Sequence, residues 1–539
     1  MPIAIAALSC ATPALARTTY VAPYIEIGQV VDANLRSDDV VTYSQVAVGV
    51  DAGIASPHAQ GQISLRYDRR FAWNDRLADT DFITGLARGS VRLGSDLSFD
   101  AGALATRARS DMRGAAPGVL AGDVDNMAQL YSFYAGPSLS TRAGALQIAA
   151  GYRFGYTRAD TPGFTGIAPG QPRLDYFSES TGHLATASIG VAAGEVAPFG
   201  VTLSGGFDRE NAGQLAQRYQ GQFVRGDVMM PVSRTVALRA GAGYEKIEAS
   251  QKDPLVDANG NPVLDGRGRF VTDPSAPRRI AYRTDGLIYD AGVVWRPSPR
   301  LELQANAGYR YGGATYFGSL AWQTSGHSAL NAQVYDSIQT FGRQLTGGLA
   351  ALPTAFQTQN DPFGQQLTGC IFAAQPGTGT GGAAGGAAGG GAGSCLNNIF
   401  QSISTATYRA RGVDAIYSWR VGRSTLGVGV GYADRKLYAP QGAPGITVLG
   451  ANDQSYYSQI FYARALSRNS QLDARLFANY YESGLPGTVG VLGLGATGTY
   501  MHQFGRLGTT ASLGIYGYDQ HDIESQWSAQ ALLGARYTF

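Results

Sequence analysis

The chain contains no long apolar run, little charge and almost no lysine. Beyond the extreme N-terminus there is no stretch of about 18 apolar residues, so the sequence predicts no transmembrane helix. Only 15% of the 539 residues are charged, whereas ordinary soluble domains carry roughly 25%. Low charge without long apolar runs is typical of a chain in which apolar and polar residues alternate along β-strands.

The scarcity of lysine makes arginine the dominant cation. The only lysines are Lys246, Lys252 and Lys436, and the rest of the 42 basic residues are arginine. Arginine binds carboxylates and phosphates bidentately, but a high genomic GC content would produce the same bias, and both explanations stay open. The net charge of +2 gives no indication of nucleic-acid binding.

Motifs that would indicate catalysis or a bound metal are also missing. There is no G-x-S-x-G elbow, and metal-ligand spacing is absent among the five histidines, His58, His183, His327, His502 and His521. A G-x-G-x-x-G match at Gly493–Gly498 lies inside an alternating segment with no helix after it, so the context of a dinucleotide site is absent. Spacing does not test a Ser-His-Asp site assembled across strands, but nothing supports one. The sequence therefore predicts no enzyme, no cofactor and no metal.

One acidic segment loosely resembles a calcium loop. It contains Asp257, Asn259, Asn261 and Asp265. The EF-hand pattern fails, because Pro262 stands where glycine is required and Gly268 where the bidentate glutamate is required. A hydrophilic turn is the favoured interpretation, and a low-affinity surface cation site is the alternative.

The last fifteen residues, Ser525–Phe539, alternate between two faces without a break. Successive side chains of a β-strand point to opposite sides. The apolar face has aromatic residues at its ends and small aliphatic residues between them, as a lipid-facing strand requires. It consists of Trp527, Ala529, Ala531, Leu533, Ala535, Tyr537 and Phe539.

This segment resembles the last strand of bacterial outer-membrane β-barrels, which typically ends in Phe with Tyr two residues before it. In that family the segment is read by the barrel-insertion machinery. The resemblance implies that Trp527, Tyr537 and Phe539 form an assembly signal, that the insertion machinery is a partner, and that the protein lies in the outer membrane of a Gram-negative bacterium.

The same alternation recurs along the chain and predicts an all-β fold. We expect a transmembrane antiparallel up-and-down barrel of about 22 strands (roughly 18 to 24) over residues 17–539, with no plug domain. The predicted strands begin near Thr19, Val40, Ala59, Phe82, Asp96, Met127, Ala143, Ser180, Pro198, Gln217, Arg234, Ile280, Arg300, Ala314, Ser328, Ala406, Arg423, Asp453, Ser470, Val489, Arg506 and Ser525.

The connections between these strands support the same topology. With both termini in the periplasm, every second connection should be a short turn, and Ser56–His58 and Val421–Arg423 are examples. The long connections alternate with these turns along the chain, which places them at the opposite end of the barrel. The longest, 342–405, is Gly/Ala-rich and either extracellular or lumenal, and it is the best candidate for a constriction of the lumen.

The cysteines and the N-terminus fit an exported protein. Residues 1–16 form an apolar run that ends in an A-x-A site, so a signal peptide is predicted, although its start could be truncated because no basic residue precedes it. Its removal would take Cys10 with it, while lipidation of Cys10 is the less favoured alternative. Cys370 and Cys395 then remain and are predicted to form a disulfide, with two unpaired thiols as the alternative.

Charged residues on the polar faces of the strands are predicted to line the lumen. They either pair across strands and hydrate the wall, or form an arginine-rich surface that selects anions. The predicted residues are Arg66, Asp68, Arg70, Arg88, Arg92, Arg153, Arg239, Glu245, Glu302, Arg310, Asp473, Arg475 and Arg536.

The predicted function is a pore for solutes or for an anionic polymer such as exopolysaccharide. The general layout and the opening segment TTYVAPYIEIGQVVDANL also resemble outer-membrane barrels associated with exosortase and exopolysaccharide systems. The alternative is a non-conducting structural or surface-interaction barrel whose long loops bind partners. Outer-membrane lipid and an anionic solute or polysaccharide are expected partners, nucleic acid is not, and the barrel is expected to be a monomer.

Overall fold

The computed structural model describes residues 18–36, 39–73, 79–111, 113, 126–161, 175–357, 363, 369–374, 392–396, 399, 403–445, 450–485, 488–520 and 523–539. The predicted signal peptide therefore lies outside the described residues. No helix in the described ranges is long and apolar enough to cross a membrane.

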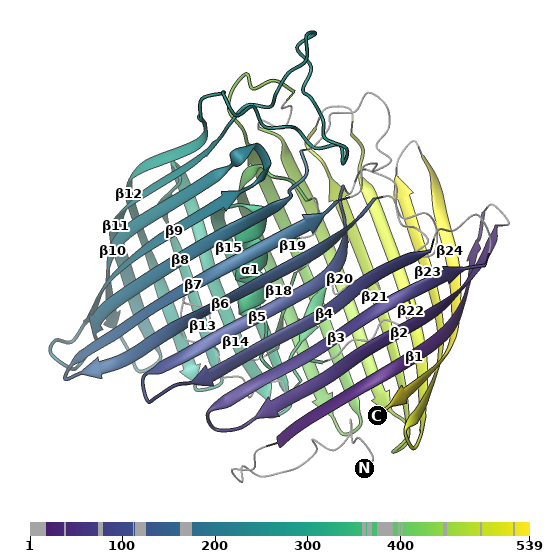
Figure 1. Cartoon of the computed structure of the whole chain (residues 1–539). Helices are drawn as coiled ribbons and strands as arrows, with labels where there is room; N and C mark the ends of the chain where they lie inside the picture. Colours follow the sequence, from purple (N-terminus) through teal and green to yellow (C-terminus); the bar gives the residue numbers. More distant parts are fainter. Residues whose placement is uncertain are drawn as a thin grey trace.

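The described strands form one closed antiparallel ring of 22 strands (Figure 1). Each strand pairs with the next along the chain, β15 pairs with β18, and β1 pairs with β24 to close the ring. The strands are β1 Thr18–Asn34, β2 Val40–Ala55, β3 Ala59–Ala72, β4 Thr80–Arg92, β5 Leu97–Arg109, β6 Met127–Ala143, β7 Leu146–Asp160, β8 Glu179–Val191, β9 Gly200–Ala212, β10 Arg218–Pro231, β11 Val236–Gln251, β12 Arg279–Ser298, β13 Leu301–Arg310, β14 Gly313–Ser325, β15 Ser328–Gln339, β18 Thr407–Val421, β19 Ser424–Tyr438, β20 Asn452–Ala465, β21 Ser470–Glu482, β22 Val491–Phe504, β23 Leu507–Gln520 and β24 Ile523–Thr538.

The all-β antiparallel barrel and the number of strands are confirmed. The largest error among the predicted strand starts is at the seventh strand, which was expected near Ala143 and begins at Leu146. The alternation of apolar and polar residues was sufficient to locate the strands, because each strand has one face toward the lumen and one face outward.

The two faces of the wall differ in chemistry as well as in exposure. On β3, Leu65 and Tyr67 point outward and are exposed. Asp68 and Arg70 on the same strand point to the lumenal side and are buried. On β24, Leu533 is 70% exposed and its neighbour Leu532 only 3%. A strand with this pattern keeps a single register, because a shift by one residue would exchange the two faces.

The connections differ between the two ends of the barrel. At the end where Thr18 and Phe539 lie, which we call the terminal end, the turns are short, as Gly505–Arg506 between β22 and β23 illustrates. Long loops gather at the opposite end, which we call the loop end (Figure 1). Two connections at the loop end have only two residues each. One is the turn Tyr311–Gly312, where both residues have positive φ (56° and 75°), as a tight hairpin requires; the other is residues 521–522, between β23 and β24.

Between β15 and β18 the chain leaves the wall and enters the ring. We call residues 340–406 the lumenal insertion, of which 340–357, 363, 369–374, 392–396, 399 and 403–406 are described. It contains the helix α1 (Phe341–Ala351) and the short paired strands β16 (Cys370–Phe372) and β17 (Gly393–Cys395). Figure 1 shows α1 inside the ring of strands. The rest of the loop predicted at 342–405, which includes the Gly/Ala-rich tract, lies outside the described residues.

Candidate functional site

Helix α1 packs on the inner wall through one apolar face. Phe341, Leu345 and Leu349 recur every four residues, which places them on one side of a helix. All three are buried in the largest apolar cluster of the described residues, with wall residues such as Leu104 and Tyr134. The helix contacts β5, β6, β7 and β8. One half of the lumenal insertion is therefore held by apolar burial.

Arg88 on β4 caps the C-terminal end of α1. Its Nε donates to the carbonyl oxygen of Leu352 at 3.1 Å, and its second guanidinium nitrogen donates to that of Ala350 at 3.0 Å. The last carbonyls of a helix have no partner within the helix, and a cation is favoured there by the helix dipole. Arg88 therefore acts as a cap supplied by the barrel wall.

The N-terminal end of α1 is held by acidic residues of β9. Arg343 of the helix pairs with Asp208, with its Nε 2.7 Å from the carboxylate oxygen. The hydroxyl of Thr340 donates to Glu210. These acidic residues were not among the predicted lumenal residues, although Asp208 and Glu210 follow the polar phase of their strand.

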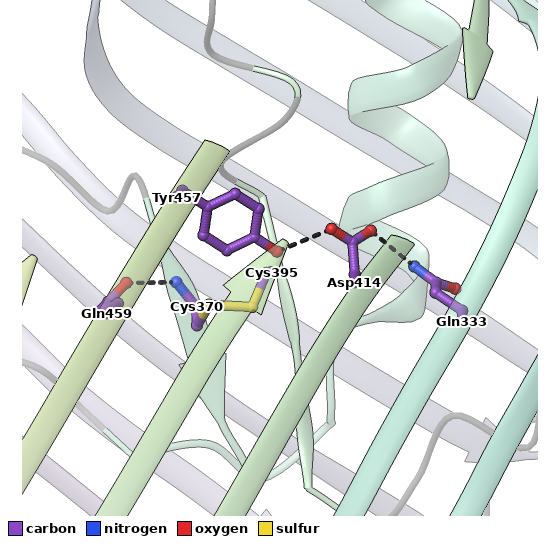
Figure 2. The surroundings of a disulfide bond; sticks show 6 residues. All are labelled: Gln333, Cys370, Cys395, Asp414, Tyr457 and Gln459. Atoms are coloured by element: carbon purple, nitrogen blue, oxygen red, sulfur yellow. Dashed lines mark hydrogen bonds between the residues drawn. A yellow bond between two sulfur atoms is a disulfide. The ribbon is translucent and has the colours of Figure 1, made fainter. Parts of the chain in front are cut away.

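The other half of the insertion is a disulfide-linked pair of short strands. Cys370 and Cys395 face each other across β16 and β17 and are joined by a disulfide (Figure 2). The backbone N–H of Cys370 donates to the side-chain oxygen of Gln459 on β20 at 2.8 Å. Beside it, Asp414 accepts from the Tyr457 hydroxyl at 2.8 Å, as Figure 2 shows. We call residues 370–372 and 393–395 the disulfide hairpin.

Glycines of β19 make room for the disulfide hairpin. A Cβ added to Gly427 would overlap the ring of Phe372, and one added to Gly429 would overlap the sulfur of Cys370. These glycines lie two residues apart and therefore on the same lumenal face of the strand. The wall can be approached this closely only because no side chain is present there.

Further side chains attach the insertion to other parts of the wall. Arg70 donates to the carbonyl oxygen of Phe363 at 3.1 Å, and Arg420 to that of Ala374 at 3.2 Å. The side-chain oxygen of Gln62 accepts from the N–H of Phe356 at 3.0 Å. Because these anchors lie on β3 and β18, and α1 packs on β5 to β8, the described insertion extends from one side of the lumen to the other.

A cavity of about 1940 Å³ lies between the insertion and the terminal end. Leu352, Ala374 and Cys395 of the insertion contribute to its lining, and so do Pro57 and Ala192 in turns of the terminal end. Its charged lining residues include Arg88, Arg92, Arg153, Arg239, Arg420, Asp96, Asp100, Asp227 and Asp414. The lumen at the terminal end is thus hollow, lined by charged as well as apolar residues, and bounded by the insertion.

Many of the predicted lumenal residues form ion pairs with one another or with neighbours. Arg66 lies 2.9 Å from Glu26 and 2.8 Å from Asp68. The remaining pairs are Arg239 with Asp227 at 3.1 Å, Arg536 with Asp51 at 2.7 Å, Arg310 with Glu245, and Glu302 with Arg296. Apart from Arg66 with Asp68, which both lie on β3, these pairs join different strands.

Other predicted residues make no ion pair within the described part of the chain. The guanidinium of Arg153 lies over the ring of Tyr134, and that of Arg475 over Phe461. Asp473 accepts a hydrogen bond from Gln471 at 2.8 Å, and Arg92 stands at the terminal end of β4. Arg88 instead donates to carbonyl oxygens of the insertion. Arg70 is not one of this group; it donates to the carbonyl oxygen of Phe363 in addition to its other contacts.

A buried carboxyl joins three loops at the loop end. Asp175 accepts from the side-chain amide of Gln214 at 2.7 Å, from the N–H of Phe270 at 3.2 Å and from the hydroxyl of Thr405 at 3.2 Å. Burial raises the pKa of Asp175 to about 7, although these donors oppose the shift. No pattern in the sequence indicated this residue, because its partners are distant along the chain.

The remaining motifs have ordinary structural roles. Gly493, Gly495 and Gly498 lie within β22. The carboxylate of Asp257 accepts from the backbone N–H groups of Asn259 and Asn261 in a turn, as favoured from the sequence. The described residues contain no group of three or more histidine, cysteine or acidic residues that could hold a metal.

The predicted assembly signal lies at the seam of the barrel. Trp527 and Tyr537 are on β24, which pairs with both β1 and β23, and Phe539 follows directly after the strand. The rings of Tyr537 and Phe539 lie 5.2 Å apart. Both are exposed on the outside of the ring.

Comparisons with known proteins identify no relative by sequence. No protein-family model matches the chain, and no curated protein sequence matches it. Among solved structures, the FrpB iron transporter from Neisseria meningitidis is similar over 96% of this chain and 82% of its own, with a TM-score of 0.41 and 10% identity. The ferric-catecholate import receptor Fiu from E. coli covers 95% of this chain and 81% of its own, with a TM-score of 0.41 and 11% identity.

At these scores and identities the likeness does not bear on function. Nothing in the comparisons supports the resemblance to exosortase-associated or exopolysaccharide-associated barrels.

Proposed function

We propose that the protein is an outer-membrane β-barrel that passes small solutes through a lumen controlled by the lumenal insertion. The observation that carries this proposal is the cavity of about 1940 Å³ that lies between the insertion and the terminal end. A barrel with a purely structural role would need no such space. In this proposal the terminal end faces the periplasm, as in other barrels of this class.

The outer surface supports a place in lipid. Leu287, Leu513 and Leu533 are each about 70% exposed and belong to a set of exposed apolar residues that recurs around the ring (73%, 69% and 70%). Soluble monomers rarely expose large contiguous apolar surfaces, whereas a lipid-facing barrel wall requires them. The aromatic C-terminal strand supports the same location.

A small solute fits the site better than a polymer does. The insertion is attached to β3, β4, β9, β18 and β20, so a continuous anionic polymer such as exopolysaccharide would require its removal from most of the lumen. A small solute needs only a local opening beside it. Cys370, Phe372 and Cys395 of the disulfide hairpin pack in a smaller apolar cluster, and only Ile371 of the hairpin belongs to the larger cluster around α1, so we place the opening at the hairpin.

A non-conducting structural barrel is the second candidate. It is favoured by the apolar packing of α1 against the wall, which would be costly to disrupt in full. In that case the insertion would be a permanent filling of the lumen, and the long loops would carry the function by binding partners.

The experiment that separates the two candidates is planar-bilayer conductance of the full chain and of a variant without the insertion. Gln339 and Tyr408 are paired neighbours on β15 and β18, so replacing residues 341–406 by a short Gly/Ser link leaves the pairing of β15 with β18 intact. Retention of the barrel is checked by the altered gel migration of folded, unboiled protein.

We expect brief, small openings from the full chain and a large stable conductance from the deletion variant. Folded but silent protein in both cases would exclude solute passage and leave the structural barrel. Equal, large conductance in both would show that the insertion does not control the lumen.

A further inference from the structure

We propose that Arg153 and Tyr134 form a binding site for a carboxylate or phosphate oxyanion in the lumenal cavity. The inference deepens the proposed passage of small solutes, because it names their chemical class. It goes beyond a general preference for anions, since several lumenal arginines, among them Arg66, Arg239 and Arg536, are neutralised by neighbouring carboxylates.

The first observation is that Arg153 makes no ion pair among the described residues. Arg153 on β7 lines the cavity, and its guanidinium lies 5.3 Å from the centroid of the Tyr134 ring. Among the described residues its guanidinium makes no ion pair and no hydrogen bond, and its one described contact is the face of the Tyr134 ring. A guanidinium held by an aromatic face keeps its N–H groups available for a planar anion.

The second observation is an unsatisfied hydroxyl at the same place. Tyr134 on β6 is only 2% exposed and lines the cavity, and its hydroxyl has no hydrogen-bond partner in the described structure. Buried hydroxyls nearly always have a partner. A bound oxyanion that accepts from this hydroxyl and from Arg153 would satisfy both groups.

The local charge balance favours an anion. Arg88 lies on the same Tyr134 ring at 5.2 Å and gives its donors to carbonyl oxygens, which leaves its charge uncompensated by an ion pair. The nearby carboxylates are Asp100, which lines the cavity without an ion pair, and Asp208, which is paired with Arg343. Two guanidinium groups thus face a single unpaired carboxylate.

The wall is shaped to bring these groups together. Gly102 on β5 lies between Arg88 and Tyr134 in the sheet register. A Cβ at Gly102 would overlap the Tyr134 ring and crowd the Arg88 side chain. The absence of a side chain there allows the ring to lie flat between the strands that carry the two arginines.

The test is isothermal titration of the detergent-solubilised full chain with succinate and with inorganic phosphate, and with neutral succinamide as a reference. The variants are R153Q and Y134F, and the matched control is R475Q. Arg475 is also a lumenal arginine over an aromatic ring without an ion pair, but it does not line the cavity.

We expect at least one anion to bind and succinamide not to. R153Q should weaken binding by about tenfold or more, and Y134F by about threefold or more, as the loss of a charged and of a neutral hydrogen bond predicts. D100N should strengthen binding, because it removes the opposing charge. The relative affinities for succinate and phosphate identify which oxyanion the site prefers.

Absence of binding by either anion would overturn the proposal, and so would equal weakening by R153Q and R475Q, which would indicate a general field of positive charge. Binding requires no conduction. Anion binding by a barrel that is silent in bilayers would support this site while solute passage fails, and a conducting barrel that binds neither anion would overturn the site alone.

Discussion

Arg88 of the barrel wall donates from Nε to the carbonyl oxygen of Leu352, 3.1 Å away, at the end of a helix that lies inside the lumen. The two residues are distant in the sequence, and the contact joins the fixed ring to the segment that fills it. It shows that lumenal arginines in this protein bind backbone as well as carboxylates.

Loss of the Arg88 cap should loosen the insertion but not the barrel. R88Q removes the hydrogen bonds that a cationic donor makes to two carbonyl oxygens at the end of α1. A hydrogen bond that involves a charged group stabilises a fold by roughly 1.5–3 kcal/mol. We expect more frequent openings in planar bilayers and an unchanged unfolding temperature of the ring. R92Q is the matched control, because Arg92 lies on the same lumenal face of β4 and has no hydrogen bond or ion pair with the described residues of the insertion. Equal effects of the two substitutions would refute the capping role.

A side chain at Gly429 should displace the disulfide hairpin. In G429V the new methyl groups would occupy the space of the Cys370 sulfur, so we expect higher conductance with a normally assembled barrel. Gly286 on the lumenal face of β12 has open space around it, and G286V is therefore the control. Conductance that is unchanged in G429V would mean that the hairpin does not limit the opening.

The disulfide should restrict the opening of the insertion. Cys370 and Cys395 are 25 residues apart. A cross-link over a loop of this length lowers the conformational entropy of the unfolded loop and thereby stabilises the folded form by about 3 kcal/mol or slightly more. We expect the double variant C370S/C395S to raise the open probability, and a thiol reductant to have the same effect on the unaltered chain. The double variant itself serves as the control, since a reductant that still changes its conductance must act elsewhere.

The loop junction at Asp175 should make the loop end sensitive to pH. Its pKa of about 7 lies above the unfolded value of 3.8, so the neutral form is favoured in the folded protein. The resulting stabilisation is complete below about pH 4 and is lost as the pH rises through 7. Protease resistance of the loops should therefore fall as the pH rises from about 4 to about 8, that is, from the unfolded pKa to roughly one unit above the shifted pKa. D175N should flatten this dependence, and a slope that persists in D175N would assign it to another group.

The C-terminal aromatic residue should matter for assembly in the cell more than for stability. We expect F539G to reduce the amount of assembled barrel in the outer membrane, while the same variant refolds normally in detergent. Y500A removes another outward-facing aromatic residue, on β22, and should have little effect on assembly. A normal amount of assembled F539G would argue against the terminal signal.

The barrel was predictable because the sequence patterns that specify its strands and turns lie within short segments of the chain. Alternation within a strand such as β24 depends only on which side of the wall each residue faces, and it is independent of distant parts of the chain. The turns carry their own signals in the same way. For this reason the strand starts and the short connections follow from the sequence alone.

The insertion was not predictable in the same detail, because its contacts join distant segments. Nothing local indicates that Arg88 caps a helix, that Asp208 pairs with Arg343, or that Asp175 meets Thr405. One signal was present: Gly427 and Gly429 repeat with the period of a strand on its lumenal face, and such a row indicates that another backbone comes close.

The seam between β1 and β24 has a consequence for the order of folding. Asp32 accepts a hydrogen bond from Gln530, across a sequence separation of 498 residues, and the seam runs from Tyr24 opposite Thr538 to Asn34 opposite Ser528. All other strand pairs, apart from β15 with β18, join neighbours along the chain. Hairpins can therefore form as synthesis proceeds, but the hydrogen-bonding edge of β1 stays unpaired until the final strand is made. An exposed edge of this kind invites pairing with other chains, so a protein with this topology depends on protection of its first strand during export.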